Sequence, residues 1–144
     1  MRAVLDTNVL ISATLSRGGN EDRILRAWKR GLFDLVLSPQ ILEEMGRALL
    51  YEKLQRYRWM NEREVVELVE LLAQESLLVG GNVSVKACRD PDDDKFLAAA
   101  IEASAEYIVS VDKDLLNLKS YGNAMIVAPA SFRKILQRAE KRGK

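Results

Sequence analysis

The chain has 144 residues, 48% of them hydrophobic, and its 22 Lys and Arg residues nearly balance 21 Asp and Glu residues. This composition fits one globular domain over residues 1–144, and no apolar run approaches the ~20 residues that cross a bilayer. We expect no signal peptide, because Asp6 interrupts the first apolar run, and a reducing cytoplasm, because Cys88 is the only cysteine. Histidine is absent, which excludes Ser-His-Asp and Cys-His catalysis and nearly every protein zinc site.

Charge is unevenly distributed along the chain. Residues 89–114 contain eight acids and three bases, a local charge of −5, so the rest of the chain carries +6. A basic tail follows from about residue 130. An acidic segment in an otherwise mildly basic chain is typical of a cation-binding centre that binds a polyanion. Solvent-exposed surface residues with no such function would carry the same charges.

Hydrophobic patterning in the first half predicts short strands alternating with helices. Asn20 is the expected cap of the second helix, Ser38-Pro39 of the third, and Asn61 with Glu64 forms a capping box for the fourth. The expected elements are a strand over 2–5, helices over 8–15 and 20–30, a strand over 35–37, and helices from 39 and from 62.

The same alternation continues in the second half. We expect strands near 77–79 and 83–85, an Ala-rich helix over 93–105, a strand over 107–111 that ends at Asp112, a strand over 125–127 and a last helix from Pro129. Strands that alternate with helices indicate an α/β sandwich around a mostly parallel sheet.

Acidic residues follow the predicted strands where ligands of open parallel sheets bind. Asp6 and Asp112 each follow a strand, the run 90–94 opens a helix, and Glu43-Glu44 lies early in the helix after Ser38. Each acid also has a structural explanation as a helix cap, a dipole partner or a solvated side chain. Their convergence on one rim, with no clustered base beside them, favours Mg²⁺ or Mn²⁺, since hard cations prefer oxygen ligands.

Four segments in order resemble a PIN domain. They are DTNVL from Asp6, the Ser38 to Glu44 helix, DPDDDKFL from Asp90, and VSVDKDLL from Val109. The stretch DTNVLISATLSRGG further resembles the prokaryotic branch described as toxins of toxin–antitoxin pairs. The resemblance implies a Rossmann-like three-layer α/β sandwich and a metal-dependent ribonuclease.

The resemblance also assigns roles to individual residues. It implies a catalytic quartet of Asp6, Glu44, Asp93 and Asp112, with Glu44 fitting the spacing better than Glu43. Asp6, Asp93 and Asp112 would hold one or two Mg²⁺ or Mn²⁺ ions, with Asp114 as an accessory acid. Asn8 and Ser110 match supporting polar residues, and Val111 departs from the small residue that usually precedes the fourth acid.

Partners follow from the same resemblance. An RNA substrate, an antitoxin protein of a type II system and a homodimer are implied, and no membrane partner. Five basic side chains could bind RNA phosphates: Arg17, Arg23, Lys53, Arg56 and Arg58. Tyr57 or Trp59 could stack on nucleobases or pack between helices.

Other functions fit the sequence less well. A haloacid dehalogenase-type phosphohydrolase needs a second Asp at the position of Asn8, and a receiver domain needs an acid pair beside Asp6. The glycines form no phosphate-binding loop. A PIN-like module that binds RNA or protein without cleavage is the main alternative, and it would be expected to have lost one or more of the four acids.

Overall fold

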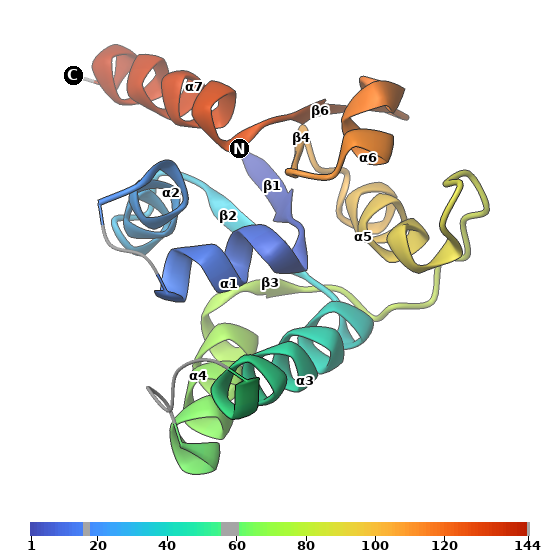
Figure 1. The fold of residues 1–144 in the computed structure, drawn as a ribbon. Helices are drawn as coiled ribbons and strands as arrows, with labels where there is room; N and C mark the ends of the chain where they lie inside the picture. The colour runs from blue at the N-terminus through green and yellow to red at the C-terminus, as the bar shows by residue number, and fades with distance from the viewer. Residues whose placement is uncertain (16–17, 56–60, 144) are drawn as a thin grey trace.

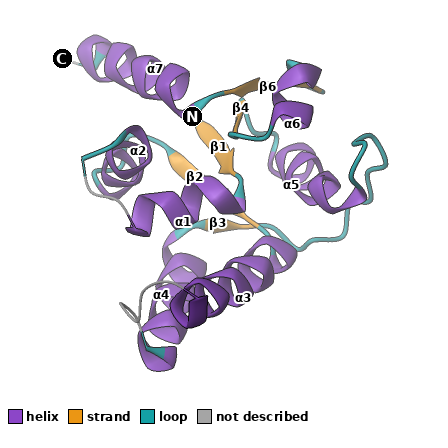
Figure 2. Cartoon of the chain, viewed as in Figure 1, coloured by secondary structure: helices purple, strands orange, loops and turns teal. Residues whose placement is uncertain are grey.

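The computed structural model describes residues 1–15, 18–55 and 61–143, and the side chains of 52–55 are not described. The chain alternates strands and helices along most of its length (Figures 1 and 2). In chain order the elements are β1 (Arg2–Leu5), α1 (Thr7–Leu15), α2 (Asn20–Lys29), β2 (Asp34–Leu37), α3 (Pro39–Gln55), α4 (Glu62–Glu75), β3 (Leu77–Leu78), the 3₁₀ turn η1 (Pro91–Asp93), α5 (Asp94–Ala103), β4 (Tyr107–Val109), α6 (Lys113–Leu118), β5 (Ser120–Tyr121), β6 (Ala124–Val127) and α7 (Pro129–Arg142).

The strands form one sheet in the order β3-β2-β1-β4-β6-β5. Every pairing is parallel except that of β5 with β6. Val4 of the central strand lies between Val36 and Ile108, so the carboxyl ends of β2, β1 and β4 reach the same edge. That edge therefore carries Ser38, Asp6 and Ser110, the residues that directly follow these strands.

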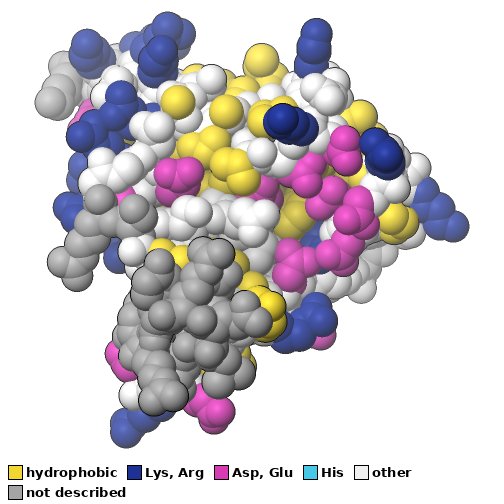
Figure 3. Space-filling model, in the orientation of Figure 1, with side chains coloured by type: hydrophobic (Ala, Val, Ile, Leu, Met, Phe, Trp, Pro, Cys, Tyr) yellow, Lys and Arg dark blue, Asp and Glu magenta, His cyan; other side chains and the backbone are white. Residues whose placement is uncertain are grey.

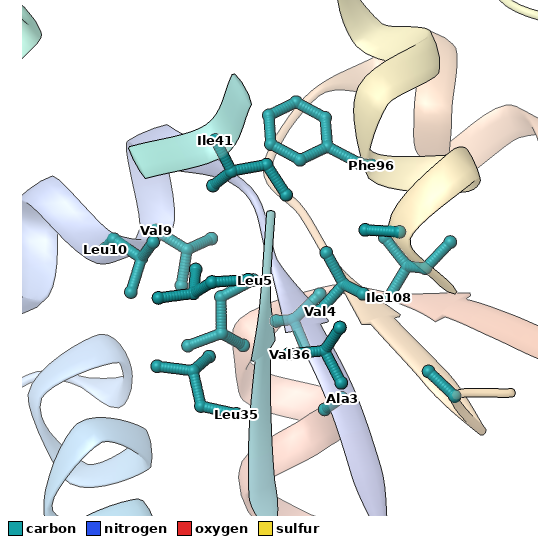
Figure 4. Close-up of a cluster of buried hydrophobic side chains, with 14 of the residues drawn as sticks. Ala3, Val4, Leu5, Val9, Leu10, Leu35, Val36, Ile41, Phe96 and Ile108 are labelled. Atoms are coloured by element: carbon teal, nitrogen blue, oxygen red, sulfur yellow. The ribbon is translucent and has the colours of Figure 1, made fainter. Parts of the chain in front are cut away.

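Helices cover both faces of the sheet. Helix α5 packs against β1, β2 and β4. On the other side of the strands, α7 contacts α2, α2 contacts α1, and α1 contacts α3 (Figure 1). Close-packed aliphatic side chains from the strands, α1, α3 and α5 fill the interior (Figure 4). Phe132 of α7 closes the core with an edge-to-face contact to Phe33, with ring centroids 5.2 Å apart. The mostly parallel three-layer α/β arrangement predicted from the sequence is confirmed.

Several predicted helix starts are also confirmed. The Asn61 side chain and Glu64 form a reciprocal capping box at α4. The Ser38 hydroxyl accepts a hydrogen bond from the Ile41 N–H (3.3 Å) at the start of α3. The Asn20 cap is wrong, because Gly19 occupies the cap position of α2 and makes no side-chain cap bond. None of the described helices has the length and apolar character needed to cross a bilayer.

The predicted strand over 83–85 is wrong, because residues 79–90 form an irregular loop. Side chains of α5 satisfy this loop's backbone in place of a neighbouring strand. One Asp94 oxygen accepts hydrogen bonds from the Ala87 and Cys88 N–H groups (3.1 and 2.7 Å). The Glu102 carboxylate accepts from the N–H groups of Gly81 and Asn82 (3.1 and 3.3 Å), which fixes the other end of the loop.

The strand predicted over 107–111 is shorter than expected. It ends at Val109, and Ser110 to Asp112 turn away from the sheet into α6, leaving Val111 exposed. The helix predicted over 93–105 begins as a 3₁₀ turn and becomes α-helical at Asp94. The short elements α6 and β5 were not predicted; α6 is only 6 residues long and depends on its cap at Asp112.

Candidate metal and catalytic centre

Asp6 is held rigidly at the end of the central strand. Its side chain is only 3% exposed, and one of its oxygens accepts a hydrogen bond from the Val9 N–H (2.8 Å) at the first turn of α1. The other oxygen accepts from the Ser110 hydroxyl and from the Val111 N–H (3.3 Å). Burial raises the pKa of Asp6, and the charge of Asp112 raises it further against these hydrogen bonds.

Ser110 connects Asp6 with Asp112. Its fully buried hydroxyl donates to Asp6 and accepts a hydrogen bond from the Asp112 N–H (2.9 Å). The Asp112 side chain caps α6, since one of its oxygens accepts from the N–H groups of Asp114 and Leu115 (2.7 and 3.3 Å). The β4–α6 turn therefore fixes two of the predicted catalytic acids on one hydrogen-bonded network.

Asp93 lies at the junction of η1 and α5, where other carboxylates surround it. Burial, together with the charges of Asp112, Asp90, Asp92 and Asp6, raises its pKa to about 6. Asp6 and Asp112 therefore act electrostatically on Asp93 although the three residues come from distant parts of the chain. Figure 3 shows acidic side chains gathered over the region of α5 and α6.

Glu44 has a basic partner that the sequence did not indicate. Lys95 of α5 donates hydrogen bonds to the Glu44 carboxylate on α3 and to Asp92 Oδ1 (3.1 Å). Burial acts to lower the pKa of Lys95, but its bonds to the two carboxylates outweigh burial and raise it. The expectation that no base stands beside the acids is wrong at Lys95, because α3 and α5 meet only in the folded chain.

Adjacent Glu43 points elsewhere. Its side chain is 71% exposed and lies 3.8 Å from Arg47 on the same helix, whereas the Glu44 side chain is 22% exposed. This difference supports the choice of Glu44 over Glu43 as the residue directed at α5.

The supporting residues take contrasting positions. Ser110 is buried within the network, as described above. Asn8 and Asp114 are both exposed, at the first turns of α1 and α6. Thr7 was not predicted; it is buried beside Asp6, and its hydroxyl finds no hydrogen-bond partner among the described residues.

One predicted RNA-binding base can be located in full. Arg23 is exposed on α2. Arg17, Arg56 and Arg58, together with the aromatic candidates Tyr57 and Trp59, lie outside the described residues. Lys53 belongs to α3, but its side chain is not among those described.

The donor chemistry of the centre fits a hard divalent cation. Asp6, Asp93 and Asp112 offer carboxylate oxygens, and a bound cation would relieve the repulsion that, after burial, contributes to the raised pKa of Asp93. Among the described side chains, no three acids or thiols form a metal-holding group.

Sequence reasoning missed Lys95, Thr7 and the Val111 N–H. A local signal existed for Lys95, since Asp92 precedes it by three residues in a helix start. Its contact with Glu44 spans 51 residues and had no such signal.

Comparison with known families decides the affiliation of this arrangement. The sequence profile described as "PIN domain" matches residues 2–114, which include all four predicted catalytic acids. The chain belongs to the PIN domain family. PIN domains are generally nucleases, and this one retains an acid at each of the four positions that the resemblance predicts.

A curated relative supports the affiliation. An uncharacterised protein of Methanocaldococcus jannaschii is 34% identical over 119 residues, which cover 83% of this chain and 76% of the relative.

Solved structures support the PIN fold. VapBC2 from Rickettsia felis, bound to a DNA fragment from their promoter, aligns with a TM-score of 0.60 at 11% identity, over 89% of this chain and 98% of that one. FitAcB from Neisseria gonorrhoeae aligns with a TM-score of 0.51 at 20% identity, again over 89% and 98%. At these identities the alignments establish a common fold.

Proposed function

We propose that this PIN domain is a metal-dependent endoribonuclease that hydrolyses RNA phosphodiester bonds. One observation carries the proposal: Ser110 joins Asp6, which follows β1, to Asp112 at the start of α6, and both carboxylates lie near enough to Asp93, just before α5, to contribute to its raised pKa. Carboxylates that repel one another across three elements are costly unless a cation joins them. The family supplies the reaction class, because PIN domains are generally nucleases.

Each residue has a defined part in this proposal. Asp6, Asp93 and Asp112 hold Mg²⁺ or Mn²⁺, with Asp114 as an outer acid at the first turn of α6. The metal supplies Lewis-acid chemistry, lowering the pKa of water and neutralising charge on the phosphate. Ser110 orients Asp6 and the Asp112 backbone through its two hydrogen bonds. Glu44, which Lys95 holds by a hydrogen bond, would orient the attacking water or serve as a further metal ligand.

We assign the protein to the toxin branch of the family. Support comes from the DTNVLISATLSRGG stretch and from the folds shared with VapBC2 and FitAcB. The proposed partners are RNA as substrate, a cognate antitoxin of a type II system and a second copy of the chain. We place this activity in the cytoplasm, consistent with a single cysteine and with the absence of a membrane-crossing helix among the described residues.

A cleavage assay tests the activity. Labelled single-stranded RNA and DNA of matched sequence are incubated with Mn²⁺, Mg²⁺ or EDTA and with wild type, Asp6→Asn, Asp112→Asn or Asp34→Asn. Asp34 is the matched control, since it is exposed at the opposite end of β2. The proposal expects metal-dependent RNA cleavage that Asp34→Asn retains and the other two variants lose. No cleavage by folded, antitoxin-free protein would contradict it for these substrates.

A non-catalytic binding module is the second candidate. The Lys95–Glu44 ion pair favours it, because Lys95 neutralises one of the four predicted catalytic acids. RNA binding that is unaffected by Mn²⁺ and by Asp6→Asn, without cleavage, is the result that this candidate expects.

A further inference from the structure

A groove between α2 and α7 is lined by arginines and belongs to a surface separate from the carboxylate centre. Its volume is about 260 Å³, and its lining includes Arg23 and Arg26 on α2, Arg30 at the C-terminal cap of α2, and Arg133 on α7. The three α2 arginines recur at successive helical turns and so form a row along one side. Figure 3 shows basic side chains gathered over α2 and α7, away from the acidic side chains over α5 and α6.

Acids neutralise part of this cluster. Arg26 Nε bonds Asp22 Oδ2 at 3.1 Å, and Arg30 lies 3.6 Å from Glu140, the one acid that lines the groove. Four guanidinium groups and one carboxylate on the lining leave a clear positive excess. Like charges facing each other across a groove are unfavourable unless an anion enters.

Arg133 provides the observation that points to a ligand. Its Nε is buried and has no hydrogen-bond partner among the described residues. Buried donors normally have a hydrogen-bond acceptor, and no described residue supplies one for this N–H. A guanidinium fork matches the oxygens of a phosphate and binds them through two parallel hydrogen bonds.

We infer that the groove between α2 and α7 binds phosphodiester groups of an RNA strand at a distance from the cleavage centre. The inference rests on the proposed function for its choice of RNA. A row of arginines suits a chain of phosphates better than a single ion. The groove supplies the attraction that the acidic segment 89–114, with its charge of −5, cannot give a polyanion.

Binding measured without cleavage tests the inference. Fluorescence anisotropy of a labelled single-stranded RNA in EDTA is recorded over a range of salt concentrations for wild type, Arg23→Gln/Arg133→Gln, Arg133→Lys and Arg63→Gln. Arg63→Gln is the control for the loss of one exposed positive charge, because the Arg63 side chain is 87% exposed on α4 and forms a local ion pair with Glu67. Thermal unfolding checks that each variant is folded, and Arg23→Gln alone replaces the double variant if that one is not.

The inference predicts at least fivefold weaker binding for the double variant. Because each phosphate contact to a single strand contributes about 0.7 to the slope of log affinity against log salt, the slope should fall by about 1.4. Arg133→Lys should lose affinity although its charge is kept, and Arg63→Gln should bind within twofold of wild type. Equal losses for Arg63→Gln and the double variant, or no loss for the double variant, would overturn the inference.

Two further results separate this inference from its alternatives. Polyglutamate of matched charge should compete poorly with RNA, and equally good competition would overturn phosphate recognition in favour of an acidic protein. If wild type binds RNA without cleaving it and the groove variants lose that binding, the result supports the groove inference and contradicts only the nuclease proposal. Cleavage by wild type with unchanged binding in the groove variants contradicts only the groove.

Discussion

The ammonium of Lys95 on α5 donates a hydrogen bond to the carboxylate of Glu44 on α3. The two side chains are 14% and 22% exposed, so the ion pair is largely shielded from solvent. It links Glu44 to the first turn of α5, which follows Asp93. This contact distinguishes Glu44 from its neighbour Glu43, whose side chain is 71% exposed and lies beside Arg47.

Removing Lys95 should leave Glu44 half-buried without its charge partner. We expect Lys95→Met to lower the free energy of unfolding by about 1–2 kcal/mol, less than a fully buried pair because solvent still reaches both groups. Urea unfolding of Lys95→Met, Glu44→Gln and the double variant measures the coupling. The exposed pair Arg63–Glu67 is the matched control and should couple by under ~0.5 kcal/mol. Equal coupling for the two pairs would contradict the structural role of Lys95.

Glu44 and Glu43 offer a comparison between neighbouring residues. Under the proposed function, Glu44→Gln should lower the RNA cleavage rate by about 100-fold, the lower range for loss of a group that acts on a proton in the reaction. Glu43→Gln should cleave normally, since Glu43 is 71% exposed and turned toward Arg47. Single-turnover rates with saturating protein provide the measurement. Slow cleavage by Glu43→Gln together with normal cleavage by Glu44→Gln would contradict the assignment of this role to Glu44.

Ser110 should matter for both stability and charge. Ser110→Ala removes a fully buried hydroxyl that serves Asp6 and the Asp112 N–H, at a cost of about 1–3 kcal/mol in the free energy of unfolding. It should also raise the pKa of Asp6 further, because the Ser110 hydrogen bond lowers it. Ser131→Ala, on the exposed surface of α7, is the control and should change stability by less than ~0.5 kcal/mol. Equal losses in the free energy of unfolding for the two variants, measured by urea unfolding, would contradict the role of Ser110 as a bridge between Asp6 and Asp112.

Asp93 should make stability depend on pH in the mildly acidic range. Its pKa of about 6 lies above the ordinary value of 3.8, so between these values the folded protein holds a proton that the unfolded chain has released. The stability that this proton provides is present in acid and is lost as the pH rises through about 6.

Asp93→Asn removes this dependence. In EDTA the variant should be more stable than wild type by about 1 kcal/mol near pH 7, and the difference should vanish near pH 4. Urea unfolding at both pH values gives the measurement, with Asp34→Asn as control on the opposite edge of the sheet. A variant less stable than wild type at neutral pH would show that Asp93 is not repelled by its neighbours.

Local patterns sufficed for much of the fold. The apolar run that ends at Asp6, the Ser38-Pro39 start of α3 and the Asn61–Glu64 capping box each act within a few residues, and each is confirmed. Residues 83–85 alternate like a strand but lie in a loop, because Asp94 and Glu102 bond the loop's N–H groups from α5. Such side-chain contacts across elements leave no periodic trace in the sequence.

The candidate site divides in the same way. Asp6 and Ser110 come together because parallel strands place their carboxyl ends on one edge, which strand prediction anticipates. The Lys95–Glu44 pair depends on how α3 and α5 pack and could not be read from spacing. The arginine groove joins α2 to a helix that begins more than one hundred positions later, so only Arg23 among its members was singled out in advance.

Mn²⁺ binding tests the carboxylate centre most directly, because it needs no knowledge of the RNA target. Electron paramagnetic resonance of free Mn²⁺ is followed during titration with wild type, Asp6→Asn, Asp93→Asn, Asp112→Asn and the control Asp34→Asn. The account predicts that wild type and Asp34→Asn bind Mn²⁺ alike and that each of the other three variants binds at least about tenfold more weakly, a difference of about 1.4 kcal/mol. Folded Asp6, Asp93 and Asp112 variants that bind as tightly as wild type would contradict it.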